Sequence, residues 1–469
     1  SDQVQMPHRK GSKLSALRIA ARNGDVQLVE QQLKETHFED HEDAAAARYT
    51  ALAIASKYNQ SEVIDALLRA KADVTRGGAP IVHAASQRIL LRLLEEKAGV
   101  NATALRGRTK LIRVAEDPDA HPEGRIHWFE LLISHKASVN AARKDGTSAL
   151  MVLSQRPHPF QRQAAEILLS TKQVHINARD LLGNTALTIA CQQSNLEMAR
   201  LLVQHDADVN VQNASGYSPL MWAASHGDTQ SLKVLLNSKS IVHANANNEN
   251  LHGKTVFSYA VEHENLDMVR CMLAAKIAPG RPQDLILLAA QRGNARILRL
   301  LGDVCTHVNP DLRSDSHGLN AMAYACWHLD VGMVRYLVEH FLCSVNAKDT
   351  NGNTPLHNAL RVVGENVSVH ALRSQTARKS TSFNRMYRVV KYLVDEGTDP
   401  RIENKQGKNP DRAAKTKGGS RCQPSQTVMG FIHRTRLSRQ RMDITAALDR
   451  DLAVTFMLHP QISVAMKID

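Results

Sequence analysis

The sequence predicts an all-α fold in which pairs of short helices, joined by short β-hairpin loops, stack into one long array. Three observations lead to this prediction. A short phrase containing a leucine recurs along the 469-residue chain, and an apolar pair such as Leu201-Leu202 follows it about 14 residues later. Apolar residues make up 43% of the chain, which is enough for a packed interior. Aromatic residues make up only 4%, which argues against a β-sandwich.

The recurring phrase reads as a turn followed by the start of a helix. Its strongest copies lie at residues 183–190, 216–223 and 352–359. Each copy begins with a glycine, which can adopt the positive φ that a tight turn requires. Thr185 or Ser218 can cap the helix through its side-chain oxygen, and Pro219 and Pro355 suit a first helical position. Since a single helix pair cannot bury its own apolar face, we expect the pairs to stack and share one core.

We number the repeats from 1 to 11 by the leucine of this phrase or by the residue that replaces it. These ruler residues are, in order, Leu17, Leu52, Ile81, Leu111, Leu150, Leu187, Leu220, Phe257, Ile286, Met322 and Leu356. They lie 29 to 39 residues apart, and a degenerate twelfth repeat begins at residues 407–410. One quasi-linear array therefore replaces the roughly three globular domains that length alone would suggest.

This pattern resembles the ankyrin repeat, whose helix start reads Thr-Pro-Leu-His-x-Ala in a period of about 33 residues. Residues 354–359 carry that phrase in full, and the resemblance covers residues 14–414, after a polar segment at 1–13. It implies an ankyrin-repeat solenoid. It also implies that His357 ties neighbouring loops together by hydrogen bonds.

The array departs from its own period at four places. Insertions lengthen the connections at residues 116–124, 157–160, 240–250 and, within repeat 11, 365–385. The last of these is basic, with Arg373, Arg378 and Lys379, and is poor in apolar residues, so we expect a flexible loop there. It is either a tolerated insertion or a regulatory or partner-binding loop.

Residues 415–469 follow the array as a basic linker and a C-terminal extension. Apolar residues at helical spacing predict two helices, over residues 425–437 and 443–458. We expect these two helices to form a small cap on the open end of the stack.

The formal net charge of +13 is distributed unevenly. Residues 361–469 contain 20 Lys and Arg against 10 Asp and Glu, whereas residues 1–360 contain 39 against 36. Such a basic region raises the alternatives of nucleic-acid binding or acidic-lipid binding. Few aromatic residues are interleaved with the basic ones in this region, which argues against the nucleic-acid alternative.

The sequence contains no enzyme motif that we recognise, so we expect no catalytic activity, no metal site and no cofactor. The residual alternative is a cysteine-dependent activity in the tail, where Cys422 lies among basic residues and His433 or His459 could approach it. Cys191 and Cys326 occupy small, buried positions of the repeat. The six cysteines form no Cys-x-x-Cys pairs and no run of about 18 apolar residues occurs, which predicts a reducing compartment, cytoplasm or nucleus, and no membrane span.

The resemblance implies a concave surface that binds partners through the ends of the first helices and the hairpin tips. The corresponding residues here are Arg22, Lys57, Tyr58, Leu181, Leu182, Gln192, Tyr217, His226, Glu262, His263, Arg292, Trp327 and His328. Trp327 suits an interface anchor, with packing against the neighbouring repeat as the alternative. Trp222 replaces a core leucine, and we expect it to be buried.

These expectations favour a monomeric, non-catalytic scaffold or adaptor that binds one or more proteins. Two alternatives stay open. The first is an effector, similar to those that intracellular bacteria deliver into the host cytosol, whose tail carries a separate activity. The second is electrostatic binding to nucleic acid or acidic lipid through residues 361–469.

Overall fold

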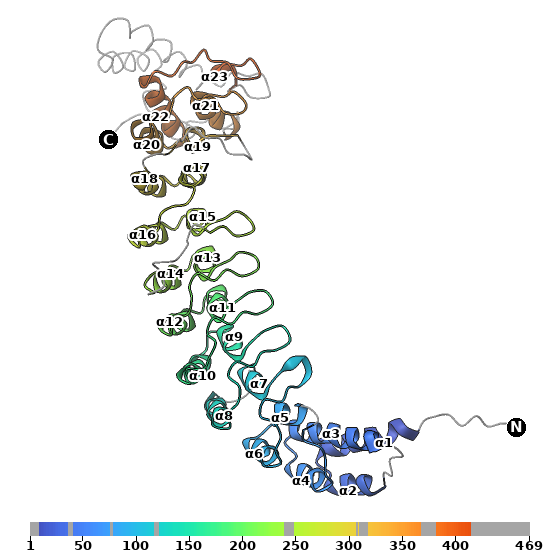
Figure 1. The fold of residues 1–469 in the computed structure, drawn as a ribbon. Helices are drawn as coiled ribbons and strands as arrows, with labels where there is room; N and C mark the ends of the chain where they lie inside the picture. The colour runs from blue at the N-terminus through green and yellow to red at the C-terminus, as the bar shows by residue number, and fades with distance from the viewer. Residues whose placement is uncertain are drawn as a thin grey trace, which may run out of the picture. The chain divides into compact units, whose positions relative to one another are not determined.

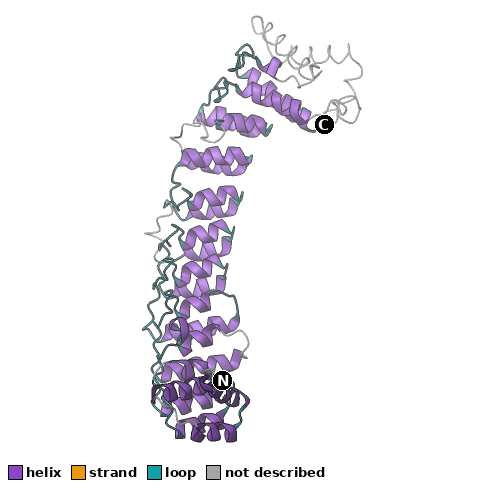
Figure 2. Ribbon diagram, turned by 90° about the vertical axis from the view of Figure 1, so that its right-hand side faces the viewer, coloured by secondary structure: helices purple, strands orange, loops and turns teal. Residues whose placement is uncertain are grey.

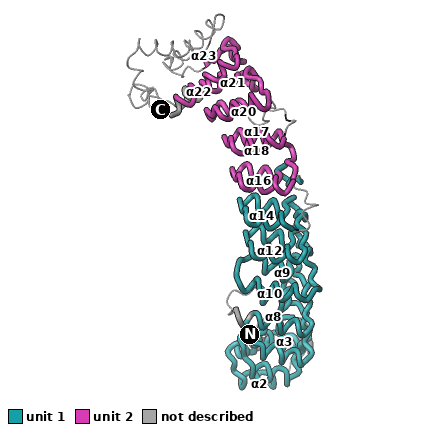
Figure 3. The backbone as a smooth tube through the Cα atoms, turned by 90° about the vertical axis from the view of Figure 1, so that its left-hand side faces the viewer, with its two compact units in different colours: residues 1–254 teal, residues 255–469 magenta. Residues whose placement is uncertain are grey.

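A computed structural model describes residues 9–35, 41–75, 78–116, 122–238, 248–305, 308, 318–366 and 381–413 of the chain. The chain divides into two compact units, unit 1 at residues 1–254 and unit 2 at residues 255–469 (Figure 3). Each unit is a stack of antiparallel helix pairs. The predicted all-α ankyrin-type architecture is therefore confirmed in both units.

Unit 1 has two layers of helices (Figure 1). The first helices of its repeats are α1 (Arg9–Asn23), α3 (His41–Lys57), α5 (Ala79–His83), α7 (Lys110–Glu116), α9 (Ala149–Ser154), α11 (Ala186–Gln192) and α13 (Pro219–Ser225). The second helices are α2 (Val26–Glu35), α4 (Ser61–Arg69), α6 (Gln87–Glu95), α8 (Pro122–Ser134), α10 (Pro159–Ser170), α12 (Leu196–Gln204) and α14 (Thr229–Leu236). Each first helix packs on the first helix of the next repeat, which makes one continuous layer.

Unit 2 repeats the same plan. Its first helices are α15 (Val256–Glu262), α17 (Pro282–Arg292), α19 (Ala321–Trp327), α21 (Pro355–Asn366) and α23 (Pro410–Ala413). Its second helices are α16 (Leu266–Ala274), α18 (Ala295–Val304), α20 (Val331–Phe341) and α22 (Thr381–Asp395). Within each unit the connecting loops lie along one side of the helices (Figure 2).

The core follows the ruler residues. Every one of the eleven lies in a first helix and is at most 4% exposed. The second helices contribute buried leucines such as Leu202 and Leu235 from their inner faces. The two predicted periodic positions therefore form the shared apolar core of each stack.

The first helices begin with the predicted caps. The Oγ1 atom of Thr185 accepts a hydrogen bond of 3.2 Å from the Thr188 amide, and the Oγ atom of Ser218 accepts one of 3.2 Å from the Met221 amide. Pro219 and Pro355 are the first residues of α13 and α21. These caps satisfy backbone donors that the first turn of a helix leaves without partners.

Five hairpin loops project from unit 1 beside the first helices and are hydrogen-bonded to one another. Each tip donates a main-chain hydrogen bond to the preceding tip: Lys144 N to Arg106 O (3.0 Å), Leu181 N to Asp145 O (2.9 Å), Ala214 N to Leu182 O (2.8 Å) and Leu251 N to Ser215 O (3.1 Å). A short 3₁₀ turn, η1 (Leu105–Gly107), forms the first tip. We call this series the hairpin ladder, and it holds the tips in fixed positions.

His357 joins two hairpins of unit 2, as the resemblance implied. Its Nδ1 atom accepts from the Thr354 amide at 3.1 Å, so the ring proton is on Nε2 and is donated to the Lys408 carbonyl at 3.0 Å. Burial lowers the pKa of His357 below its ordinary value, which favours the neutral ring that this arrangement uses.

The structure differs from two sequence expectations, one at the insertion of repeat 11 and one at the N-terminal segment. Helix α21 continues to Asn366 and α22 begins at Thr381, so both edges of the predicted loop 365–385 are helical. Helix α1 begins at Arg9, inside the segment assigned to the polar N-terminus. Arg373, Arg378 and Lys379 lie outside the described residues, as does everything after residue 413, including Cys422 and the two expected tail helices.

Candidate functional site: the face of the first helices and hairpins

The predicted partner-binding residues lie at the ends of first helices and on hairpin tips, as the repeat geometry requires. Those with exposed side chains are Arg22, Lys57, Tyr58, Leu181, Leu182, His226, His263, Arg292, Trp327 and His328. Those that are half-buried are Gln192, Tyr217 and Glu262. We call the surface that these positions share, in each unit separately, the first-helix face.

Repeats 1 and 2 bring three predicted residues together. The guanidinium carbon of Arg22 lies 5.1 Å from the ring centre of Tyr58, and the Nζ atom of Lys57 lies 5.5 Å from the same ring. The Gln60 side chain also donates to the Arg22 carbonyl at 3.1 Å. Two cations thus contact one exposed aromatic ring, which is a favourable cation–π arrangement.

Repeat 7 brings an aromatic row to the same face. The Tyr217 and Trp222 rings are stacked with centres 4.4 Å apart, and the His226 ring lies 5.6 Å beyond Trp222. The His226 Nδ1–H group donates to the Trp222 carbonyl at 2.9 Å, which fixes the imidazole at the helix end.

The prediction that Trp222 is buried was wrong. Trp222 is half-buried and stands two residues after the ruler Leu220, where its ring stacks on Tyr217 of the hairpin. The same position is half-buried in repeats 2 to 4 but buried in repeats 5, 6, 8 and 10, where it holds Val152, Ile189, Tyr259 and Tyr324. The Nε1 atom of Trp222 is buried and has no hydrogen-bond partner within the described residues.

Four leucines stand exposed on the hairpin ladder of unit 1. Leu181 and Leu182 are 77% and 65% exposed, and they are joined there by Leu105 at 84% and Leu251 at 77%. Sequence reasoning missed Leu105 and Leu251. A signal for them exists, since Leu105, Leu181 and Leu251 each stand two residues before a hairpin glycine.

In unit 2, Trp327 ends α19 and is 41% exposed. The guanidinium carbon of Arg361, on α21 of the next repeat, lies 5.8 Å from its ring centre. His328 turns toward the preceding repeat, where its Nε2–H group donates to the Gln291 carbonyl at 2.8 Å. Both side chains therefore pack against neighbouring repeats and still present surface to solvent.

Sequence reasoning also missed a group of cations in unit 1, which we call the basic cluster. Its members are Lys57, Arg106, Arg108, Lys110, Arg113 and Arg143. They come from α3, from the hairpins of repeats 4 and 5, and from α7, so they are up to 86 positions apart in the chain. Four of them lie within residues 106–113, a short basic run with no acidic residue, whereas Lys57 and Arg143 are distant in the sequence.

The described residues offer little reactive chemistry. Cys191 and Cys326 are buried as predicted, and burial raises the pKa of both thiols. No group of three or more His, Cys, Asp or Glu side chains gathers as a metal site in the described part of the chain. Among the same residues, no helix combines the length and apolar character needed to cross a membrane.

Comparison with known proteins agrees with this geometry. A family model described as "Ankyrin repeats (3 copies)" matches residues 111–213, 158–248, 206–283 and 285–382, together more than half of the chain. Similar curated proteins include ankyrin repeat domain-containing protein 63 of Mus musculus, which is 31% identical over 122 residues, 26% of this chain and 31% of that protein.

Two further relatives match shorter shares of their own length. Inversin of Mus musculus is 26% identical over 179 residues, 38% of this chain and 16% of inversin. Ankyrin repeat domain-containing protein 13C-A of Xenopus laevis is 48% identical over 61 residues, 13% of this chain and 12% of that protein. The chain thus spans about a third or less of the length of these relatives. It belongs to the ankyrin-repeat family, whose repeats are in general protein–protein interaction modules.

Proposed function

We propose that the chain is a non-catalytic scaffold or adaptor that binds a partner protein through the first-helix face. One observation carries this proposal. The tip of repeat 6, which carries Leu181 and Leu182, is joined to the hairpin of repeat 7, which carries Tyr217 of the Tyr217–Trp222 stack, because the Ala214 amide donates to the Leu182 carbonyl. We call these four side chains the repeat 6–7 patch.

The composition of this patch suits a protein interface. Large apolar and aromatic side chains dominate the energetically important centres of such interfaces. The hairpin ladder holds Leu181 and Leu182 on hydrogen-bonded backbone, so binding would order little additional chain.

Polar residues surround this apolar centre on the same face. His226 and Gln192 lie at the ends of α13 and α11 beside the patch. An apolar centre with a polar rim is the usual composition of a protein-binding surface. The exposed ends of the other first helices of unit 1 extend the rim in this proposal.

The experiment compares partner recovery by three forms of the full chain. Wild type, the double variant Leu181→Ser/Leu182→Ser and the control Leu91→Ser are used to co-purify proteins from extracts of the source cells. Leu91 is 39% exposed on α6 of the opposite face and provides a matched leucine-to-serine change. Each recovered partner is then titrated against all three forms.

We expect the double variant to bind the partner about tenfold or more weakly, since removal of an interface anchor costs more than about 1 kcal/mol. Wild type and Leu91→Ser should bind alike, and all three forms should melt at similar temperatures. Equal affinity of wild type and the double variant would contradict the proposed surface. A catalysed turnover that survives in residues 1–413 alone would contradict the non-catalytic assignment.

A further inference from the structure

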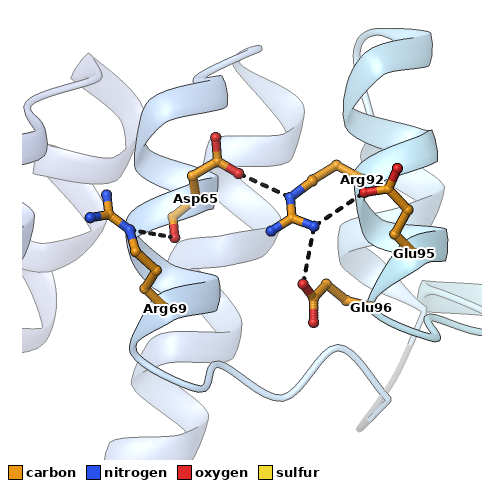
Figure 4. A network of polar contacts seen from close by, with 5 residues as sticks. All are labelled: Asp65, Arg69, Arg92, Glu95 and Glu96. Atoms are coloured by element: carbon orange, nitrogen blue, oxygen red, sulfur yellow. Dashed lines mark hydrogen bonds and ion pairs between the residues drawn. The ribbon is translucent and has the colours of Figure 1, made fainter.

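Charged side chains of repeats 2 to 5 are distributed unequally between the two faces of unit 1. On the face of the second helices, Arg92 of α6 is surrounded by carboxylates (Figure 4). Its guanidinium lies 3.1 Å from oxygens of Asp65, Glu95 and Glu96. The positive charge there is already matched by the chain's own acidic residues.

On the first-helix face the balance is reversed. The cations of the basic cluster are accompanied by two carboxylates, Glu116 and Asp145. One of the six cations, Lys110, is buried, donates to the Ala84 carbonyl and lies over the Trp128 ring of α8, so five are available on this face. Glu116 contacts both Arg108, at 3.4 Å, and Arg143, so one carboxylate is shared between two guanidinium groups. The net charge of this group of side chains is +4, although residues 1–360 as a whole carry 39 basic against 36 acidic residues.

The pKa of His83, on α5, is affected by the excess of positive charge. Burial and then the nearby cations Arg113, Lys57, Lys110 and Arg108 lower the pKa of His83 to about 4. An imidazole surrounded by cations from α3, α7 and a hairpin disfavours protonation because the added charge would be repelled. His83 is therefore neutral at pH 7.

Arg143 points to the same excess. Burial and then repulsion by Arg108 lower its pKa, with Arg106 adding to that repulsion, even though Glu116 and Asp145 are close. The two acidic residues therefore do not neutralise the surrounding arginines. A further carboxylate placed here would form charge-assisted hydrogen bonds with groups that now repel one another.

The surroundings favour a peptide carboxylate over a nucleic-acid phosphate. The side chains of Arg108 and Arg143 are recessed, at 35% and 19% exposure, and four of the six cations lie around the single imidazole of His83. Nucleic-acid binding instead uses cations spread along a strand. The neighbouring tip residue Leu105 is 84% exposed, which adds an apolar contact that a protein segment can use.

We propose that the basic cluster is the docking site for an acidic segment of the partner protein. Carboxylates of that segment pair with Lys57, Arg106 and Arg113, whose charges no ion pair among the described residues neutralises. This inference rests on the proposed function, since it assigns a partner chemistry to the first-helix face of unit 1. It predicts a segment rich in Asp and Glu with at least one apolar residue near Leu105.

The test uses the full chain and labelled peptides. The probe is a glutamate-rich peptide with one leucine, and the comparison peptide has every glutamate replaced by glutamine. The cluster variant is Lys57→Gln/Arg106→Gln/Arg113→Gln. The matched control is Arg92→Gln/Arg162→Gln/Arg200→Gln, which removes three positive charges from the second helices α6, α10 and α12.

We expect wild type and control to bind the acidic peptide alike, and the cluster variant to bind it about tenfold or more weakly. Binding should weaken as salt is added, because partly exposed charges are screened. The glutamine peptide should not bind. Failure of wild type to bind the acidic peptide, or equal binding by the cluster variant, would overturn the proposal, as would tighter binding of a single-stranded oligonucleotide by the same residues.

A readout at His83 separates docking from a general structural effect. Carboxylates placed among Lys57, Lys110, Arg108 and Arg113 should raise the pKa of His83 from about 4, which an imidazole proton resonance can follow during a pH titration. The His83 titration, and not the affinity, is the readout, because the glutamates of the peptide lose their charge in the same pH range. An unchanged His83 titration in the presence of bound peptide would place the peptide elsewhere.

The two proposals can fail separately. If a partner binds wild type and the cluster variant equally but loses affinity for Leu181→Ser/Leu182→Ser, the acidic-segment inference is wrong and the protein-binding surface stands. If the cluster variant loses binding while the leucine variant keeps it, the basic cluster is the site and the repeat 6–7 patch is not.

Discussion

Repeat 6 and repeat 3 of unit 1 bury equivalent ruler residues but begin their first helices in different ways. Fifteen residues separate α10 from α11 in repeat 6, and they form a hairpin. Only nine residues separate α4 from α5 in repeat 3. Yet Leu187 and Ile81 are both 1% exposed.

The hairpin of repeat 6 is hydrogen-bonded throughout. Asp180 accepts from both the main-chain and side-chain nitrogens of Asn184, at 2.7 and 3.2 Å. The Asn184 side chain in turn accepts from Asn213 of the next hairpin at 2.9 Å. Thr185 then caps α11.

Repeat 3 replaces these contacts with three single hydrogen bonds. The Gly78 amide donates to the Thr103 carbonyl at 3.1 Å, and the Ala79 amide donates to the Tyr49 hydroxyl at 3.1 Å. The Ala85 amide donates to the Ser56 carbonyl at 2.9 Å. The comparison teaches that stacking requires the buried ruler residue, whereas the hairpin can be lost if neighbouring repeats satisfy the exposed backbone donors.

The largest predicted effect comes from shortening the buried ruler residue of repeat 6 or of repeat 3. It tests whether the two residues contribute equally to stability. Leu187→Ala and Ile81→Ala should each lower the free energy of unfolding by about 2–5 kcal/mol, because each leaves a cavity in a packed interior. Urea unfolding of both variants measures the losses. A much smaller loss for Ile81→Ala would show that the repeat without a hairpin contributes little to the stack, and the comparison would fail.

The next prediction concerns the hairpin ladder, which repeat 3 lacks. Gly216 and Gly227 both have positive φ, +78° and +68°. A Cβ atom at Gly216 would lie 2.7 Å from the Asn250 Cα atom of the next hairpin, whereas one at Gly227 would meet no atom within 4 Å. Gly227→Ala should therefore cost about 1–2 kcal/mol from backbone strain alone.

Gly216→Ala should cost more than Gly227→Ala, because it adds displacement of the neighbouring hairpin to the same strain. Thermal melting of the two variants under identical conditions measures the difference. Equal losses would mean that displacing the neighbouring hairpin costs no free energy. The hairpins of repeats 4 to 8 would then stabilise the stack no better than the short connection of repeat 3.

The sequence predicted those features that depend on a few neighbouring residues. The ruler residues, the caps at Thr185 and Ser218 and the buried Cys191 all follow from position within one repeat. The exposure of Trp222 was mispredicted, because Trp222 was assigned to the position of a core leucine, whereas the core leucine of that repeat is Leu220. Position in the helix decides which face a side chain occupies.

The basic cluster could be predicted only in part. Arg106, Arg108, Lys110 and Arg113 lie within eight residues that contain no acidic residue, but a sum of charges over residues 1–360 gives near neutrality and hides this run. Lys57 and Arg143 join the cluster only when repeats 2 to 5 are stacked. This part of the cluster is a property of the stack.

The smallest predicted effect asks whether surface ion pairs compensate for the missing hairpin of repeat 3. Arg92 joins α6 of repeat 3 to Asp65 on α4 of repeat 2, and Arg69 lies beside the same aspartate (Figure 4). The side chains are 41% and 44% exposed, so water and salt screen the attraction. Arg92→Ala should reduce the free energy of unfolding by less than about 1 kcal/mol.

Urea unfolding of Arg92→Ala at low and high salt measures this effect, with Arg162→Ala as the matched control. Arg162 contacts Glu166 of its own helix and Glu197 of the next repeat, between repeats that do have hairpins, whereas Arg92 contacts three carboxylates. Equal small losses in both variants would leave the apolar core and the hydrogen bonds to neighbouring repeats as the contacts that hold repeat 3 in the stack. A loss well above 1 kcal/mol at Arg92 alone would instead mean that ion pairs on the second helices substitute for the hairpin.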